Sequence, residues 1–148
     1  MRFQREEYSE NLVVEMRPLL KEHDREIPQL GLAHDPDWNI YKTMNKAKAL
    51  RIYTARVADL LVGYQVFMIG YHPHRRASLE ATQDILFLEP EVRHGMVGLK
   101  FIKYCDKELE KENVRVIHHP FDVAHDLGRL FERLGYMCTD IIYSRKVA

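Results

Sequence analysis

One stretch in the middle of the chain combines residue types that together bind an anion. An apolar run ends at Leu88-Glu89-Pro90, and Arg93-His94-Gly95-Met96-Val97-Gly98 follows directly before an amphipathic helical pattern. The first turn of a helix offers unpaired N–H groups and about half a positive charge. Glycines let a ligand approach the backbone, and an arginine adds a permanent cation. The spacing therefore predicts an anion site at the start of this helix.

The first third of the chain predicts a short strand and two helices. Residues 1–8 alternate weakly, as a strand does, and Ser9 is a suitable N-cap for the helix that follows. Pro18 interrupts the apolar spacing of that helix, which predicts a kink or a restart there. Residues 26–38 are rich in turn-forming residues and predict a loop, and Asp37 is placed to cap a second, short helix.

The rest of the chain predicts the strands of a mixed sheet and two more helices. Ala58-Asp59 has the form of a tight hairpin turn between two apolar runs, and His72 to Arg76 predicts a polar loop. The other predicted elements are a strand over Ala81–Pro90, a helix over 95–111, a strand over Val114–His119, a helix ending near Gly135 and a strand over Met137–Lys146. A strand–helix–strand crossover requires a parallel pair of strands, whereas the hairpin is antiparallel. We therefore expect an α/β fold, with a mixed central sheet and helices on both faces.

Length and charge limit the possible functions. The 148 residues suit a single domain over 1–148, and 22 Lys+Arg residues balance 22 Asp+Glu residues. A net charge of zero argues against a direct nucleic-acid partner. The N-terminus lacks the pattern of a signal peptide, and no run is apolar enough for a membrane helix. Cys105 and Cys138 both lie in apolar segments, which predicts buried thiols in a reducing, cytoplasmic compartment.

Three stretches resemble the GNAT family of N-acetyltransferases. Arg93 to Gly98 is similar to the acyl-CoA loop of the family, Gln/Arg-x-x-Gly-x-Gly/Ala, although Met96 stands where the first glycine is usual. The run DLLVGYQVF over 59–67 resembles the family's second and third strands. GRLFERLGY over 128–136 resembles the final helix, and with a terminal Tyr-x-Arg-Lys it is similar to small GNAT proteins that phages often encode. The resemblance covers nearly the whole chain.

The resemblance implies a fold, a co-substrate and a reaction. Acetyl-CoA is the expected co-substrate, with its pyrophosphate held by the amides of residues 94–98. Its pantetheine arm would pair with the backbone of Leu86, Phe87 and Leu88. The expected reaction is acetylation of a primary amine, on a small molecule or a protein, by direct attack in a ternary complex. Dimers are frequent in the family. The alternative is a GNAT-fold module with weak or no catalysis that acts by binding a partner protein.

The resemblance also suggests residues for proton transfer. The family often presents a tyrosine as general acid on the final helix, but Phe131 holds the matching, cofactor-side position and has no proton to give. The candidate substitutes are Tyr136, Tyr143, and His118 or His119 at the end of a strand, unless solvent supplies the proton, and Tyr136 is equally suited to replace a packing phenylalanine of the family. For the general base we expect Asp84, which lies two residues before Leu86 and hence on the same strand face. Asp84 is equally suited to a structural hydrogen bond.

The acceptor site, by analogy with the family, should be built by the segment that precedes the second helix. Asp35, Asp37, Trp38 and Tyr41 lie there, and an aromatic ring beside carboxylates suits a cationic amine. The alternative is that Trp38 and Tyr41 simply cover the edge of the core. Eight histidines raise the question of a metal site, but no H-E-x-x-H motif or cysteine pair is present, so no metal is expected.

Overall fold

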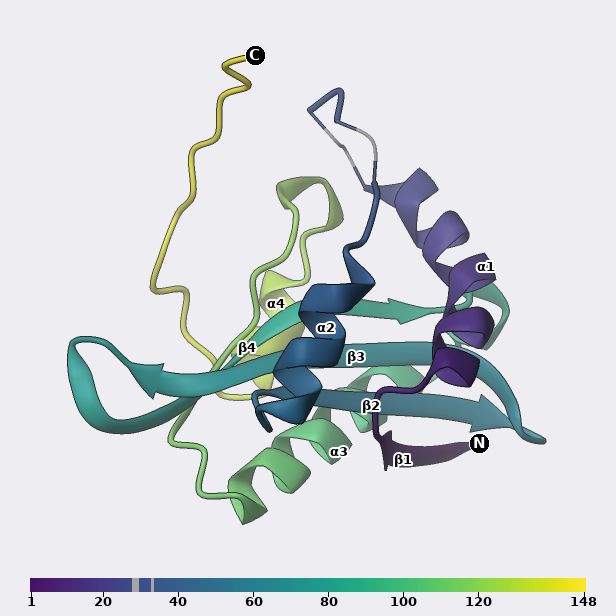
Figure 1. Ribbon diagram of the computed structural model, residues 1–148, viewed down its shortest axis with the longest axis horizontal. Coiled ribbons are helices and arrows are strands. Elements are labelled where there is room, and N and C mark those ends of the chain that lie inside the picture. The colour runs from purple at the N-terminus through teal and green to yellow at the C-terminus, as the bar shows by residue number, and fades with distance from the viewer. Residues whose placement is uncertain (28–29, 33) are drawn as a thin grey trace.

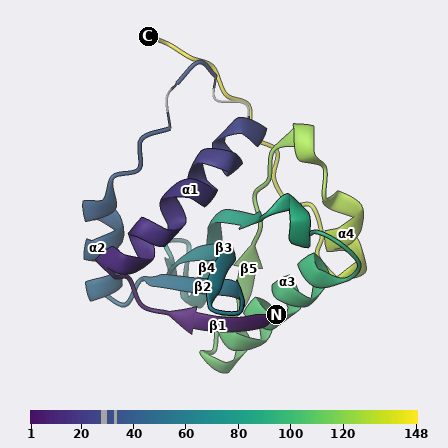
Figure 2. The same cartoon turned by 90° about the vertical axis from the view of Figure 1, so that its right-hand side faces the viewer.

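A five-stranded sheet with helices on both faces forms the body of the protein. The computed structural model describes residues 1–27, 30–32 and 34–148. Its elements in chain order are β1 (Arg2–Glu6), α1 (Glu10–Glu26), α2 (Trp38–Lys46), β2 (Leu50–Val57), β3 (Leu60–His72), β4 (Arg75–Leu88), a 3-10 turn (Pro90–Val92), α3 (Val97–Lys111), β5 (Val116–His118), a second 3-10 turn (Val123–His125) and α4 (Gly128–Arg133). Helices α1 and α2 cover one face of the sheet, and α3 and α4 lie on the other (Figures 1 and 2).

The strand order is β1-β2-β3-β4-β5, so each strand lies beside the next one in the chain. The pairs β1–β2, β2–β3 and β3–β4 are antiparallel, and the pair β4–β5 is parallel. The α3 crossover between β4 and β5 is what permits that parallel pair. The predicted mixed sheet with helices on both faces is confirmed.

Local capping and turn signals form as the sequence predicts. The Ser9 side chain accepts a hydrogen bond from the Leu12 amide at 3.1 Å, and Asp37 caps α2 through the Asn39 amide. Ala58 and Asp59 have φ angles of 47° and 67°, the left-handed pair that a tight hairpin turn between twisted strands needs. The prediction of a restart at Pro18 is wrong, because α1 continues unbroken and carries Leu19 and Leu20 onto the core.

Four other sequence predictions are also wrong. Strand β3 extends to His72 and β4 begins at Arg75, so most of the predicted polar loop is strand. Strand β4 therefore begins before Ala81, where the sequence predicts its start. Residues 137–146 form no strand, and Cys138 is exposed rather than buried. Cys105 is buried as expected, and burial raises the pKa of its thiol. Pro28, Gln29 and Ala33 of the predicted 26–38 loop lie outside the described residues.

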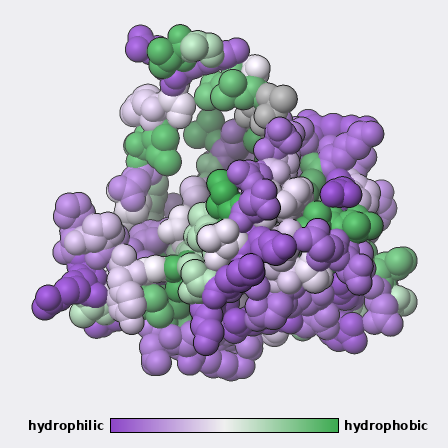
Figure 3. Space-filling model, viewed as in Figure 1, coloured by the Kyte–Doolittle hydropathy of each residue, from purple (hydrophilic) through white to green (hydrophobic). Residues whose placement is uncertain are grey.

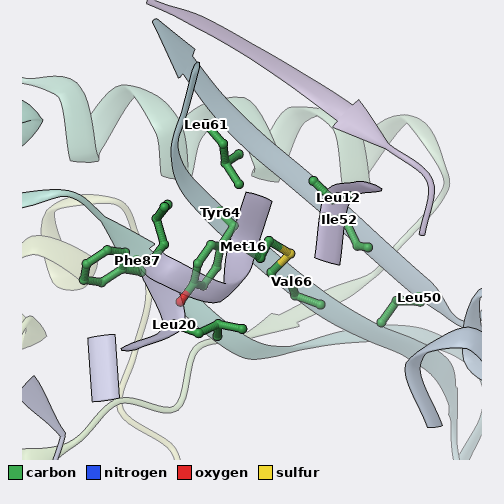
Figure 4. Close-up of a cluster of buried hydrophobic side chains, with 10 residues drawn as sticks. Leu12, Met16, Leu20, Leu50, Ile52, Leu61, Tyr64, Val66 and Phe87 are labelled. Carbon is green, nitrogen blue, oxygen red and sulfur yellow. The ribbon is translucent and has the colours of Figure 1, made fainter. Parts of the chain in front are cut away.

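The core consists of one apolar cluster on each face of the sheet. On the α1 face, Leu12, Met16 and Leu20 of the helix pack onto side chains of the sheet (Figure 4). The sheet residues of this cluster include Ile52, Tyr64, Val66 and Phe87. On the other face, α3 packs through Phe101, Cys105 and Leu109 against Tyr53, Ala55 and Phe67. Fully buried Tyr53 and Phe67 show that β2 and β3 form the centre of the sheet.

A charged cluster ties β1, β2 and α1 together. Arg56 of β2 donates to the carboxylate of Glu6 at 2.7 Å and to that of Glu15 at 2.8 Å, and Thr54 also donates to Glu6. Burial alone would raise the pKa of Glu6, but these hydrogen bonds outweigh it and lower that pKa from 4.5 to about 2. The folded state therefore favours the ionised carboxylate of Glu6.

We expect this cluster to make stability pH-dependent. Because the pKa of Glu6 is lowered on folding, its contribution is complete above pH 4.5 and is lost as the pH falls towards 2. Since solvent screens part of the interaction, Glu6→Gln should reduce the free energy of unfolding by about 2 kcal/mol at pH 7, and by progressively less below pH 4.5. Urea unfolding across this range measures the effect, with exposed Glu91→Gln as the control. An equal loss at pH 7 and pH 2.5 would contradict the assignment.

Candidate functional site

Strands β4 and β5 lie at one edge of the sheet and stop pairing partway along β4, and we call the unpaired region between them the wedge. They pair only through Glu80–Val116, Ala81–Ile117 and Thr82–His118. Beyond Thr82, the described residues give β4 no strand partner on its β5 side, although its other side stays paired with β3 as far as Leu88. Backbone groups of residues 83–88 therefore face the wedge, where an extended ligand with amide groups can pair with them.

A bulge in β4 coincides with this separation. Val66 pairs with Ile85 and the next β3 residue, Phe67, pairs with Gln83, so Asp84 is an extra residue in the ladder. A bulge bends its strand and redirects a side chain. Tyr41 of α2 donates to the Asp84 carboxylate at 2.6 Å, which places Asp84 on the α2 side. Leu86 packs with the α3 cluster instead, so the expectation that Asp84 and Leu86 share a face is wrong.

The start of α3 lies beside Leu88, at the end of this wedge, and has no side-chain cap from its N-cap residue. The N-cap residue Met96 makes no side-chain capping hydrogen bond, and the first helical turn is formed by Val97, Gly98 and the residues after them. Gly95 has a φ angle of 60°, a conformation that side chains disfavour, and open space surrounds its α-carbon. A methyl group on Gly98 would meet only Leu88, at 3.9 Å. The uncapped amides and the room around them fit a diphosphate group.

Arg93 holds the end of β4 against the end of α1, in addition to carrying a positive charge near the start of α3. Its guanidinium donates to both carboxylate oxygens of Glu26 at 2.9 Å and to the Leu88 carbonyl at 2.6 Å, and it lies over the Phe87 ring. These contacts join the end of β4 to the end of α1. Glu26 balances the charge of Arg93, so the positive potential for an anion at this site comes chiefly from the helix start.

The predicted acceptor residues gather around a groove beside α2. Asp35, Asp37 and Tyr41 line it, together with Ile40 and Met68, and its volume is about 280 Å³. The phenol of Tyr41 links the groove to Asp84. Burial, with the neighbouring Asp84 carboxylate, raises the pKa of Tyr41, so its hydroxyl stays protonated and donates to Asp84. The groove therefore offers carboxylates at its rim and a third carboxylate behind Tyr41.

Trp38 covers the edge of the core, which is the alternative to an acceptor-binding role. It packs against the α1-face cluster and its ring lies 5.6 Å from that of Tyr41. Both rings line a narrow internal cavity of about 20 Å³, enough for one water molecule. Whether Trp38 also contacts an acceptor stays a prediction.

A buried polar chain crosses the opposite side of the wedge, and the sequence did not reveal it. Gln83 of β4 lies 2.8 Å from His119 Nδ1, and His119 Nε2 lies 3.1 Å from the Tyr136 hydroxyl, which donates to Asp106 of α3. Burial and Asp106 raise the pKa of Tyr136. These hydrogen bonds connect β4, α3 and the segments around β5 and α4 on one side of the wedge.

The candidate acids His119 and Tyr143, and Phe131 at the position where the family presents its acid, lie in different surroundings. The His119 side chain is 2% exposed, and both its ring nitrogens are engaged. Phe131 is buried and stacks on Phe121, with ring centroids 5.4 Å apart. Tyr143 is 92% exposed in the segment after α4. The structure brings His119 and Phe131 together, with ring centroids 4.6 Å apart, but leaves Tyr143 in solvent.

Metal clusters and membrane-spanning helices are both absent from the described ranges 1–27, 30–32 and 34–148. In these ranges, no three His, Cys, Asp or Glu side chains converge as metal ligands would. No helix there has the length and apolar character that crossing a bilayer requires.

Comparisons with known proteins identify the fold. No protein-family model and no curated protein matches the sequence. The similar solved structures include a ribosomal-protein-alanine N-acetyltransferase from Brucella melitensis biovar Abortus 2308, with a TM-score of 0.73 and 16% identity over 99% of this chain and 100% of that one. An aminoglycoside acetyltransferase from an uncultured soil metagenomic sample, in complex with sisomicin, has a TM-score of 0.76 and 10% identity over 99% and 96%. A predicted acetyltransferase with acetyl-CoA from Clostridium acetobutylicum has a TM-score of 0.68 and 11% identity over 98% and 96%. Together with the mixed sheet and its open wedge, this likeness shows that the chain has the GNAT fold.

Proposed function

We propose that this protein is an acetyl-CoA-dependent N-acetyltransferase that acetylates a primary amine. The observation that carries the proposal is the wedge between β4 and β5, which runs from the bulge at Asp84 to the uncapped start of α3. One continuous path thus offers strand backbone without a strand partner and then a helix start without a side-chain cap. Acetyltransferases with this fold, one of them with acetyl-CoA, support the assignment.

The residues around the wedge suit the parts of acetyl-CoA. The backbone of Leu86, Phe87 and Leu88 would pair with the pantetheine amides, and the amides of residues 94–98 would hold the pyrophosphate. Phe131 would close the α4 side through its packing against Phe121. The bound co-substrate supplies an acetyl thioester. The protein supplies position, and Arg93 fixes the end of β4 to α1.

The groove beside α2 is the proposed acceptor site. Asp35 and Asp37 would attract a cationic amine, and Tyr41 orients Asp84 by its hydrogen bond. A nitrogen that attacks a thioester carbonyl becomes much more acidic as its new bond forms, so a nearby carboxylate can accept its proton directly or through a water molecule. We assign that role to Asp84. Attack is direct, because the buried Cys105 has a raised pKa and is unsuited to form an acyl-enzyme.

Phe131 cannot supply the proton that the departing thiolate needs, because a phenylalanine side chain has no acidic hydrogen. A thiol has an ordinary pKa near 8.5, so its thiolate is a far better leaving group than an alkoxide and solvent can protonate it. Tyr143 and His119 remain the candidate acids. Phe131 packs between Phe121 and His119 and carries no proton to donate. This observation favours the second candidate function, a weakly active or inactive module that binds a partner protein.

Two measurements test the proposal. Acetyl-CoA at a hundred times its dissociation constant should add about 2.7 kcal/mol of stability, or roughly 5–10 °C in Tm. Release of free thiol from acetyl-CoA should be slow but measurable with some members of a panel of primary amines. The absence of a Tm shift at millimolar acetyl-CoA would contradict the co-substrate. A Tm shift without thiol release for any amine would favour the binding module.

A further inference from the structure

The buried polar chain described above reaches the point where β4 and β5 stop pairing. Its members, in the order of their hydrogen bonds, are Gln83, His119, Tyr136 and Asp106. Gln83 and His119 each come directly after the last pair of residues that joins the two strands, Thr82 and His118. The 2.8 Å hydrogen bond between Gln83 and His119 therefore spans the wedge at the end where the strands begin to separate.

Gln83 determines that the Nδ1 atom of His119 carries a hydrogen. The Gln83 Nε2 donates to the Pro120 carbonyl at 3.4 Å, and the Gln83 Oε1 accepts from the Gln65 amide at 3.2 Å. The Nδ1 atom of His119 lies 2.8 Å from the same Oε1. Because an amide oxygen can only accept, Nδ1 must donate, and its hydrogen points to the β4 side of the wedge.

The second ring nitrogen of His119 faces Tyr136 and Asp106. The Tyr136 hydroxyl has one hydrogen and donates it to Asp106 at 2.9 Å, so its oxygen is left to accept from His119 Nε2 at 3.1 Å. Asp106 Oδ1 itself lies 3.7 Å from Nε2. The rings of Phe67 and Phe131, which also contact His119, are uncharged. These hydrogen bonds place a hydrogen on both nitrogens, and the Asp106 carboxylate balances the resulting charge.

Asp84 and the polar chain meet β4 at the same place but on opposite faces of the sheet. Asp84 bonds to Tyr41 on the α2 side, whereas Gln83 pairs with Phe67, which packs with the α3 cluster. In the path proposed for acetyl-CoA, the pantetheine arm follows residues 88 to 86, so the thioester comes next to residues 84 and 83. The attacking amine then has Asp84 on its side of the thioester, and the leaving sulfur has His119.

We propose that His119 is the general acid of this transferase, and that Gln83, Tyr136 and Asp106 position it. The proposal rests on the function proposed above. As the carbon–sulfur bond breaks, its electron pair stays on sulfur, and the Nδ1–H of His119 gives that sulfur a proton. The remaining Nε2–H is held by the Tyr136 hydroxyl. Solvent returns a proton to Nδ1 before the next turnover, while Asp84 releases to solvent the proton that it takes from the amine.

The polar chain thus takes over the task that Phe131 cannot perform. The ring of His119 lies 4.6 Å from that of Phe131, beside the position where the family presents its acid. The phenol of Tyr143 is 92% exposed, in the segment after α4 that stands clear of the body of the molecule (Figure 3). His119 is therefore in place at the wedge, and Tyr143 is not.

Nitrogen-15 NMR of the free protein tests the hydrogen positions without any measurement of activity. Histidine side chains change charge between about pH 5 and 8. Nδ1 of His119 should carry a hydrogen both at about pH 6 and at about pH 8, and Nε2 should carry one at the lower pH. In Gln83→Leu, which removes the acceptor, the neutral ring should instead keep its hydrogen on Nε2, towards Tyr136. An Nδ1 atom without a hydrogen at about pH 8 in the parent chain would overturn the proposal.

Steady-state kinetics test the acid role. His119→Gln should lower kcat at least about tenfold, while the affinity for acetyl-CoA stays within about threefold. The loss should lie at the lower end of acid catalysis, because a thiolate leaves more readily than an alkoxide. Tyr136→Phe keeps the ring but not the hydroxyl, and its loss in kcat should be smaller. The control is His74→Gln, which changes an exposed histidine in the β3–β4 turn and should alter neither parameter.

The outcomes separate this proposal from the proposed function. Unchanged kcat in His119→Gln, in a parent chain that releases thiol, would refute the acid role alone. A larger loss in Tyr143→Phe than in His119→Gln would also refute it. No thiol release by the parent chain with any amine would refute both. Because His119 is buried, thermal unfolding checks each variant, and if His119→Gln does not fold, unchanged kcat in both Tyr136→Phe and Gln83→Leu would overturn the proposal.

Discussion

Asp84→Asn should lower kcat by about 10²-fold or more while the affinity for acetyl-CoA stays unchanged. General base catalysis contributes ~10²–10⁴-fold, and an amide cannot accept the proton of the attacking nitrogen. The substitution keeps an oxygen that can accept the Tyr41 hydroxyl, now 2.6 Å from Asp84, so the bulge and the position of α2 should persist. Steady-state kinetics with the best amine of the panel, together with a binding titration of acetyl-CoA, measure the two parameters separately.

Two further variants separate chemistry from structure. Asp59→Asn makes the same carboxylate-to-amide change in the exposed β2–β3 turn, where Asn tolerates the φ of 67°, and kcat should not change. Tyr41→Phe removes the hydrogen bond but keeps the carboxylate, so its loss in kcat should be smaller than that of Asp84→Asn. If Asp84→Asn retains kcat within about threefold, Asp84 is a structural partner of Tyr41 and another group or water takes the proton.

Gly98→Val should weaken acetyl-CoA binding at least tenfold without reducing the stability of the free protein. Charge-assisted hydrogen bonds are worth about 1.5–3 kcal/mol each, so branched methyl groups that displace a phosphate from one helix amide account for such a loss. A Cβ atom at residue 98 meets only Leu88, at an ordinary 3.9 Å, and valine is no worse than glycine in a helix. Isothermal titration with acetyl-CoA and thermal unfolding without it measure the two effects.

Gly70→Val provides the matched control for this substitution. Gly70 lies in β3, is exposed, and has open space around its α-carbon, so the same change there should leave acetyl-CoA affinity unaltered. Gly98→Ala should be intermediate, because its single methyl group protrudes less. Normal affinity in Gly98→Val would show that the pyrophosphate lies elsewhere along the 94–98 segment or at another helix.

The sequence by itself determined the features that depend on residues close together in the chain. Ser9 and Asp37 cap their helices, Ala58-Asp59 forms the hairpin turn, and the run from Arg93 to Gly98 precedes α3, because each is set by local hydrogen bonds and backbone preferences. The apolar periods of the strands and helices also suffice to predict a mixed sheet covered on both faces. Most of the path proposed for acetyl-CoA therefore follows from residues that are close together in the chain.

Only the tertiary structure decided how the site residues face one another. The bulge that turns Asp84 towards Tyr41 depends on the β3–β4 register, which no run of β4 residues encodes. Arg93 and Glu26 are 67 residues apart, and Gln83 and His119 are 36 apart, so their pairing follows from chain packing. Residues 137–146 have the sequence of a strand, but among the described residues they have no strand partner. A strand needs a second backbone to satisfy its hydrogen bonds, and sequence propensity cannot supply one.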